Sequence, residues 1–107
     1  MNKFPLIAKS VKGIGIRLTE ERWTHIIRRH KELKNHVINV MLTVENPDFV
    51  VAGKVGELIA VKYFAAIKPP YIIAAYREIN DKDGFIITAH FISNIEDIRK
   101  RRIVWKS

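Results

Sequence analysis

The most regular hydrophobic pattern in the chain lies between residues 17 and 33. Its apolar positions recur at spacings of three and four residues, and they are Trp23, Ile26, Ile27 and His30. This spacing is typical of an amphipathic α-helix that buries one side. Thr19 precedes the pattern and is a favourable N-cap, because its hydroxyl oxygen can accept a hydrogen bond from a free backbone N–H. We therefore predict a helix that begins after Thr19.

A second helical pattern follows Asn35 and ends before Asn46-Pro47-Asp48, a sequence typical of turns. Beyond this turn, apolar and β-branched residues form short runs that predict strands over residues 48–52, 57–65, 71–79 and 85–92. The last two runs flank a loop of turn-forming residues and are predicted to form a hairpin. Ser93 and Glu96 then have the spacing of a capping box, which predicts a short C-terminal helix.

This order of elements predicts an α+β fold in a single domain, residues 1–107. Two N-terminal helices would pack on one face of a three- to four-stranded antiparallel sheet, and a short C-terminal helix would follow. A chain of 107 residues is long enough for one hydrophobic core. Residues 1–13 show no clean period, and we expect either a flexible arm or an apolar segment that covers an edge of the core.

Alternation along the last predicted strand separates two faces. The more apolar face is assigned to the core and consists of Phe85, Ile87, Ala89 and Phe91. Thr88 and His90 then point to the other side as neighbours along the strand. Lys62 and Arg77, on the two preceding strands, are candidates for the same pocket, although a register shift of one residue would put Tyr76 in place of Arg77. All three tyrosines are expected to pack in the core or across strands rather than to stack on bases.

A second stripe along the first predicted helix is polar and consists of Arg22, His25 and Arg29. Two guanidinium groups suit a phosphate, and the imidazole between them is a candidate for proton transfer. His30 belongs to the apolar stripe, and we assign it to a partly buried role at the helix end. His25 and His30 are five residues apart, which is a poor match for two ligands of one metal ion, so we expect no metal site.

The chain carries a formal net charge of +8 and has a sequence pI near 10.0. Such a charge favours a polyanionic partner, with solubility or adaptation to heat as the alternative explanation. The cluster Arg99-Lys100-Arg101-Arg102 carries more positive charge than the end of a helix requires. The absence of cysteine from the sequence excludes disulfides, thiol catalysis and thiolate metal sites.

Other functions lack their sequence motifs. The chain has no Walker loop, no His-Glu-x-x-His and no Gly-x-Ser-x-Gly, and we expect no cofactor. No apolar run approaches the roughly 18 to 20 residues that a membrane span requires. Pro5 and Lys9 interrupt the N-terminal apolar residues before a signal peptide could develop. We therefore expect a cytoplasmic protein with no membrane partner.

Four short motifs occur in an order that resembles a known family. They are Leu18-Thr-Glu-Glu-Arg-Trp-Thr-His25-Ile, Arg29-His30-x-Glu32, Asn46-Pro47-Asp48 and Ile87-Thr-Ala-His-Phe91. Together they resemble the phage-associated nuclease domains of the barnase, EndoU, colicin and RelE-like (BECR-fold) group, over roughly residues 14 to 105. The chain has His30-Lys31-Glu32 where many members of that group have His-Pro-Glu, and it has His90 where tyrosine is common.

The resemblance implies a small, toxin-like, metal-independent endoribonuclease that cleaves RNA by attack of a ribose 2′-hydroxyl on the adjacent phosphate. His25 or His90 would accept the hydroxyl proton, and the other histidine would donate a proton to the leaving oxygen. Thr88 would orient the phosphate. Transition-state charge would be stabilised by cationic side chains from Arg22, Arg29, Arg77 or Lys62.

Partners follow from the same hypothesis. RNA would be steered by the C-terminal cations, Arg99, Arg101 and Arg102. An inhibitor or antitoxin protein is the second candidate partner. The alternative function is a non-catalytic nucleic-acid-binding module or regulator that uses the basic ends of the chain. A third hypothesis is an oligomeric interaction protein.

Overall fold

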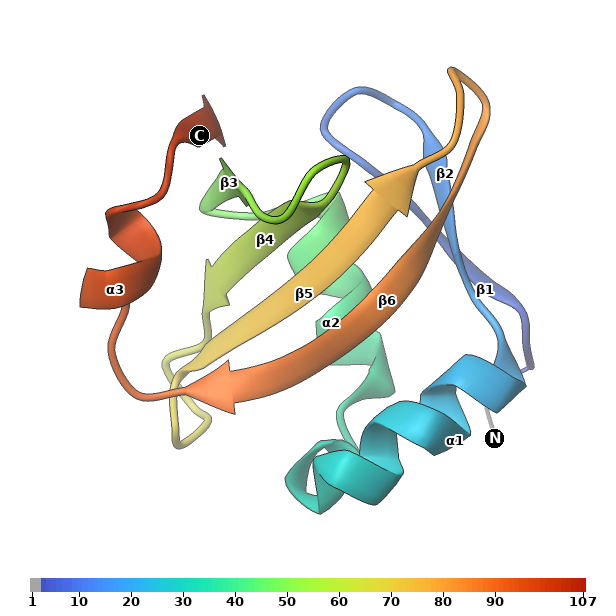
Figure 1. The fold of residues 1–107 in the computed structure, drawn as a ribbon. Coiled ribbons are helices and arrows are strands. Elements are labelled where there is room, and N and C mark those ends of the chain that lie inside the picture. The colour runs from blue at the N-terminus through green and yellow to red at the C-terminus, as the bar shows by residue number, and fades with distance from the viewer. Residues whose placement is uncertain (1–2) are drawn as a thin grey trace.

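The structure is a computed structural model that describes residues 3–107. In that range a seven-stranded sheet has the strand order β1-β2-β6-β5-β4-β3-β7 (Figure 1). In chain order the elements are β1 (Leu6–Lys9), β2 (Gly15–Leu18), α1 (Glu20–Arg29), the 3₁₀ turn η1 (Lys31–Leu33), α2 (Val37–Glu45), β3 (Phe49–Ala52), β4 (Leu58–Tyr63), β5 (Tyr71–Glu78), β6 (Asp83–Ile92), α3 (Glu96–Arg99) and β7 (Ile103–Lys106). The sheet is mixed, because β2 runs parallel to β6 whereas the other neighbours are antiparallel.

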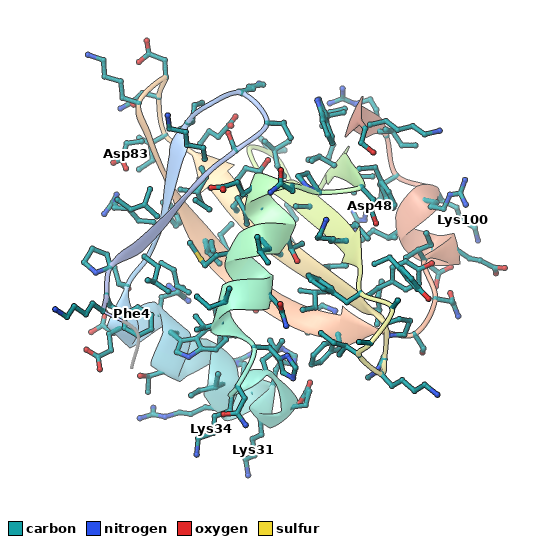
Figure 2. All side chains as sticks on the ribbon, turned by 180° about the vertical axis from the view of Figure 1, so that it is seen from behind. Phe4, Lys31, Lys34, Asp48, Asp83 and Lys100 are labelled. Atoms are coloured by element: carbon teal, nitrogen blue, oxygen red, sulfur yellow. The ribbon has the colours of Figure 1, made fainter. Side chains whose placement is uncertain are left out.

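The predicted fold, two helices on a three- to four-stranded antiparallel sheet, is wrong. Three short strands at the two ends of the chain extend the sheet, and each of them has only four residues. From the sequence, residues 14–17 are open between a short strand and an extended lead into the first helix, whereas β1 and β7 show too little alternation to be recognised. Of the two N-terminal helices, α2 crosses one face of the sheet, against β1, β4 and β5. Figure 1 shows α2 behind the strands, and Figure 2 shows it in front of them from the opposite side.

Helix α1 lies beside β6 instead of on the face that α2 covers (Figure 1). In the described residues β2 pairs with β6 only from Gly15 to Arg17, so the rest of this edge of β6 is left for α1. The predicted N-cap is confirmed, because Thr19 Oγ1 accepts a hydrogen bond from the backbone N–H of Arg22. The apolar stripe of α1 joins the main core through Trp23 and Ile26.

The N-terminal strands are held to the rest of the sheet by polar contacts. The guanidinium of Arg17 on β2 donates two hydrogen bonds of 2.9 Å to the carboxylate of Asp83 at the start of β6. This hydrogen bonding holds the pKa of Asp83 below its usual value. Instead of a flexible arm, Leu6–Lys9 forms β1, which pairs with β2, and Ala8 is buried in the main core. Residues 1 and 2 of the expected arm lie outside the described residues.

The hairpin of β5 and β6 is confirmed, and it contains a register shift. Ala75 pairs with Thr88 and Tyr76 pairs with Ile86, so Ile87 is an extra residue on β6. As a result, the expected core set of β6 is divided. Ala89 belongs to the main core beneath α2, whereas Ile87 packs in the smaller cluster on the opposite face.

We call that opposite side of β3–β6 the open face. Its buried apolar residues are Val51, Ile59, Val61, Ile73 and Ala75. Ile95 and Ile98 pack against them and hold α3 on this face. The predicted capping box is wrong: Ile95 is the N-cap of α3, and Asn94 Oδ1 accepts from the backbone N–H of Glu96. None of the described helices is long and apolar enough to cross a membrane.

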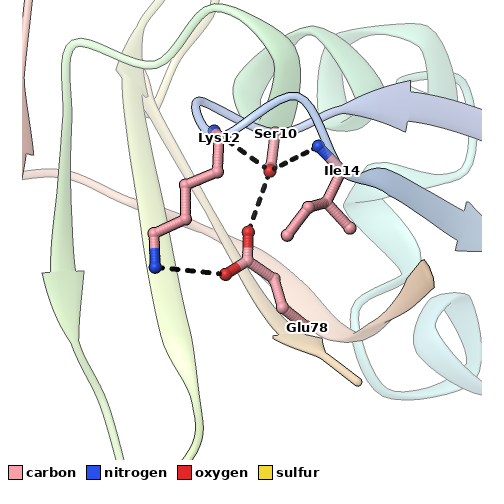
Figure 3. Close-up of polar contacts among 4 residues, drawn as sticks. All are labelled: Ser10, Lys12, Ile14 and Glu78. Atoms are coloured by element: carbon pink, nitrogen blue, oxygen red, sulfur yellow. Dashed lines mark hydrogen bonds and ion pairs between the residues drawn. The ribbon is translucent and has the colours of Figure 1, made fainter. Parts of the chain in front are cut away.

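Ser10 joins the turn between β1 and β2 to the end of β5 (Figure 3). Its hydroxyl donates a 2.9 Å hydrogen bond to Glu78 Oε2 and accepts from the backbone N–H groups of Lys12 and Ile14, each at 3.3 Å. Lys12 Nζ lies 3.7 Å from Glu78 Oε1, but its side chain is 69% exposed. Ser10 itself is buried, so its hydrogen bonds are shielded from water.

We expect Ser10→Ala to lower the free energy of unfolding by about 1 to 3 kcal/mol, because buried polar groups lose their partner. Lys12→Ala is the matched control and should cost less than about 1 kcal/mol, since an exposed ion pair contributes little. Urea unfolding followed by circular dichroism measures both values. Equal losses for the two variants would contradict this assignment.

Candidate functional site

A cavity of about 220 Å³ opens on the open face between β4, β5, β6 and α3. We call it the open-face cavity. Its floor and one wall are apolar, from Ile59, Ile73 and Ile98. Its polar lining consists of Glu57, Thr88, His90 and Arg101. Residues with a carboxylate, a hydroxyl, an imidazole and a guanidinium therefore line one small space, and the carboxylate of Glu57 lies beside Gly53 in the turn between β3 and β4.

The sheet register determines where these groups lie. Thr88 is opposite Ala75 and His90 is opposite Ile73, so both β6 residues share the open face with buried residues of β5. Glu57 immediately precedes β4, on the far side of β5. Val61 is the β4 residue level with Ile73 and His90, so Glu57 lies two strands across and four residues along the sheet from His90. The backbones that carry the two groups are therefore about 16 Å apart, at opposite ends of the cavity.

His90 is stacked on a second histidine. The ring centroids of His30 and His90 are 5.2 Å apart, and their planes differ by 25°. Burial lowers the pKa of His90, the positive charge of His30 lowers it further, and Glu32 partly opposes them. Glu32 Oε2 lies 3.8 Å from His30 Nδ1. The environment of His90 therefore favours its neutral form.

His30 occupies the position that the sequence suggested for His25. His25 is exposed on α1, whereas His30 is the C-cap residue of this helix and continues its buried stripe toward β6. At 3.6 residues per turn, His25 lies about 100° around the helix from Ile26, which is buried in the core. The stripe that anchors α1 thus brings His30 to His90 and turns His25 toward solvent.

Arg77 shares the open face with the cavity. Tyr76 is buried in the main core, which resolves the register alternative in favour of Arg77 on the open face. Arg77 Nη2 donates a 3.3 Å hydrogen bond to the carbonyl oxygen of Val55 in the turn between β3 and β4. Gly56 in this turn has a φ of +78°, and a Cβ there would collide with the Arg77 guanidinium. Gly56 therefore leaves the space in which Arg77 lies.

Lys62 does not lie at this site, contrary to expectation. It pairs with Ile72, a residue of the main core, and so faces the side that α2 covers. Its Nζ donates a 2.7 Å hydrogen bond to the carbonyl oxygen of Asn46 at the end of α2 and lies 6.0 Å from the centroid of the Phe64 ring. The alternation of side chains along β4 explains this placement, because Glu57 and Ile59 have the opposite parity to Lys62.

The remaining predicted cations are distributed over several places. Arg22 lines a cavity with Arg17 and Phe85 beside the N-terminus of α1. Arg29 is exposed in the last turn of that helix. Arg102 lines a cavity around the turn between β3 and β4. Arg99 lines a separate cavity near the start of β5. Of the predicted binding arginines, Arg101 is the one that reaches the open-face cavity.

Sequence reasoning missed two groups of this site. Glu57 was read only as the beginning of a strand, although it has the same parity along the chain as Ile59 and Val61 on the open face. That parity was the available signal. His30 was assigned to the fold because it continues an apolar stripe, and no local pattern reveals that this stripe ends against a second histidine.

Comparisons with protein-family models, curated proteins and solved structures found no match to this chain. The resemblance to the BECR-fold nuclease domains therefore stays a prediction.

The stacked histidines generate a prediction about proton binding. We expect the pKa of His90 to lie below the ordinary histidine value of about 6.5. His30→Ala should raise this pKa, because the variant removes a positive charge near His90 and part of the surface that buries it. His25→Ala is the control and should leave this pKa unchanged. NMR titration of the imidazole signals measures it. A pKa of His90 above 6.5 in the unmodified protein, or no rise in His30→Ala, would contradict the proposed environment.

Proposed function

We propose that this protein is a metal-independent endoribonuclease that cleaves RNA by attack of a ribose 2′-hydroxyl on the adjacent phosphate. The observation that carries the proposal is the open-face cavity. Glu57 and His90 line its opposite ends, and Thr88 on β6 and Arg101 after α3 also line it. The reaction is the one that the resemblance to BECR-fold nuclease domains implies. The net charge of +8 supports a polyanionic substrate.

The proposed roles follow from the chemistry of the two proton-transfer groups. A carboxylate can act as a general base, and Glu57 is assigned to accept the proton of the 2′-hydroxyl. The 2′-oxygen then forms a bond to phosphorus while the bond from phosphorus to the 5′-oxygen breaks. The imidazolium of His90 donates its proton to that leaving oxygen. The products are a 2′,3′-cyclic phosphate and a 5′-hydroxyl end. An in-line displacement needs base and acid on opposite sides of the phosphate, which is the arrangement that the proposal requires of Glu57 and His90.

Positive charge would stabilise the phosphate as it gains negative charge. Arg101 lines the cavity, and Arg77 lies on the same face. A guanidinium can donate two parallel hydrogen bonds to phosphate oxygens. The hydroxyl of Thr88 can donate a further hydrogen bond that orients the group. Such preorganised donors stabilise the transition state more in a partly dehydrated cavity than in water.

The proposed ribonuclease is toxin-like and has an inhibitor protein as a partner. A ribonuclease in the cytoplasm damages its own cell, so a toxin-like role requires a protein inhibitor as partner. The basic C-terminal segment, with five basic and two acidic residues from 93 to 107, would attract either RNA or an acidic inhibitor.

Substitution of the cavity residues tests the function. His90→Ala and Glu57→Gln should each lower kcat/KM for RNA cleavage by about 100-fold or more, since a general acid or base contributes about 10² to 10⁴ in rate. His25→Ala is the matched histidine control and should retain full activity. Cleavage of a labelled RNA in EDTA, with detection of the cyclic phosphate, measures these rates. Strict dependence on a metal would overturn the mechanism, and salt-sensitive RNA binding without cleavage would favour the non-catalytic binding module.

The pH dependence tests the assignment of His90 as the acid. Its acid form is lost as pH rises through the pKa, which burial and His30 keep below the usual value near 6.5. We expect kcat/KM to fall about tenfold per pH unit above that pKa. Glu32→Gln should move the descending limb to lower pH, because Glu32 raises the pKa of His90. A rate that increases between pH 6 and pH 8 would instead make His90 the base.

A further inference from the structure

A second cavity, of about 350 Å³, also opens on the open face. We call it the tyrosine cavity. Its lining combines the rings of Tyr63 and Tyr71 with the cationic side chains of Arg99 and Lys106. Residues of the α3 region contribute to both cavities, Arg99 to this one and Arg101 to the other. The two cavities are therefore neighbours on the open face.

The two tyrosines form a preorganised aromatic surface. Tyr63 on β4 is the register partner of Tyr71 on β5, with ring centroids 5.2 Å apart and ring planes at 62°. This edge-to-face contact fixes the orientation of the Tyr63 ring. Tyr63 is nevertheless 50% exposed, whereas Tyr76 is fully buried. The expected packing in the core or across strands is confirmed by the buried ring of Tyr76 and by the Tyr63–Tyr71 pair, but half of Tyr63 remains exposed.

Cations approach the tyrosines from two other elements. Arg99 comes from α3, and Lys106 comes from β7 at the edge of the sheet. Asp48 also lines the cavity, but its Oδ2 accepts a 2.8 Å hydrogen bond from the backbone N–H of Tyr63. Among the side chains that line the cavity, one carboxylate, engaged by the backbone, thus accompanies two cations. An aromatic surface beside net positive charge suits a ligand with a flat ring and a phosphate.

The register places this aromatic surface close to the candidate catalytic histidine. His90 pairs with Ile73, and Tyr71 lies two residues before Ile73 on the same face of β5. Diagonal neighbours of this kind are about 7 to 8 Å apart. A single extended strand of nucleotides on the open face can therefore reach both cavities.

We propose that the tyrosine cavity is a nucleotide subsite, in which a base of single-stranded RNA stacks on Tyr63 and an adjacent phosphate binds Arg99 and Lys106. The inference rests on the proposed function for the identity of the polymer, but it requires no cleavage. The aromatic face accepts any base, because stacking depends on ring area more than on hydrogen-bond pattern. Selectivity among the bases is therefore expected to be modest at this subsite.

The test measures binding of a fluorescent 2′-O-methyl RNA oligonucleotide, which lacks the attacking hydroxyl, to the unmodified protein and its variants. Tyr63→Leu should weaken binding by about 5- to 100-fold, and Tyr63→Phe, which keeps the ring, should stay within about twofold. Arg99→Gln should weaken binding. It should also reduce the slope of the logarithm of the binding constant against the logarithm of salt concentration by about the amount that one phosphate contact contributes. Inorganic polyphosphate has no base, so Tyr63→Leu should bind it as well as the unmodified protein does.

The controls separate stacking from folding and from catalysis. Thermal melting establishes that each variant is folded, and Arg99→Gln tests the subsite at an exposed residue if Tyr63→Leu is unstable. Unchanged RNA binding by a folded Tyr63→Leu, or an equal loss of polyphosphate binding, overturns the subsite. Cleavage of natural RNA with binding independent of Tyr63 overturns the subsite alone. Tyr63-dependent binding without any cleavage overturns the ribonuclease proposal alone.

Discussion

The antiparallel ladder between β5 and β6 is the constraint on which both faces of this protein depend. Because side chains alternate along a strand, the register of this ladder decides which residues lie beneath α2 and which face the opposite side. The extra residue Ile87 changes that alternation within β6. It brings Ile86 instead of Ile87 opposite Tyr76 in the main core. Thr88 and His90 lie beyond this bulge, opposite Ala75 and Ile73, so the regular part of the ladder places them on the open face.

The position of α1 is the second determinant of the site. β2 covers only the beginning of β6, and α1 lies beside the remainder. The burial of Trp23 and Ile26 fixes this helix, and its C-cap residue His30 then meets His90. Burial and the charge of His30 disfavour the charged form of His90 and lower its pKa. A histidine with a perturbed pKa that lines a cavity is a candidate functional residue.

The sequence by itself determined the features that depend on local patterns. Helical spacing and a hydroxyl at Thr19 predicted α1 and its N-cap, and both are present. The turn-forming loop between two apolar runs predicted the β5–β6 hairpin. Strict alternation predicted that Thr88 and His90 share a face, and the structure places both in one cavity. These features are set by neighbours within a few residues in the chain, so their physical causes can be read directly from composition and spacing.

Only the tertiary structure decided which distant segments meet. β1 and β7 carry too little pattern to be recognised, and no local signal shows that β2 pairs with the distant β6, so the seven-stranded mixed sheet could not be predicted. Whether His25 or His30 reaches His90 depends on where α1 docks, and this is set by core packing far away in sequence. Glu57 and Tyr63 acquire their places from the register of β4 against β5. Each of these contacts depends on long-range pairing, which no local propensity specifies.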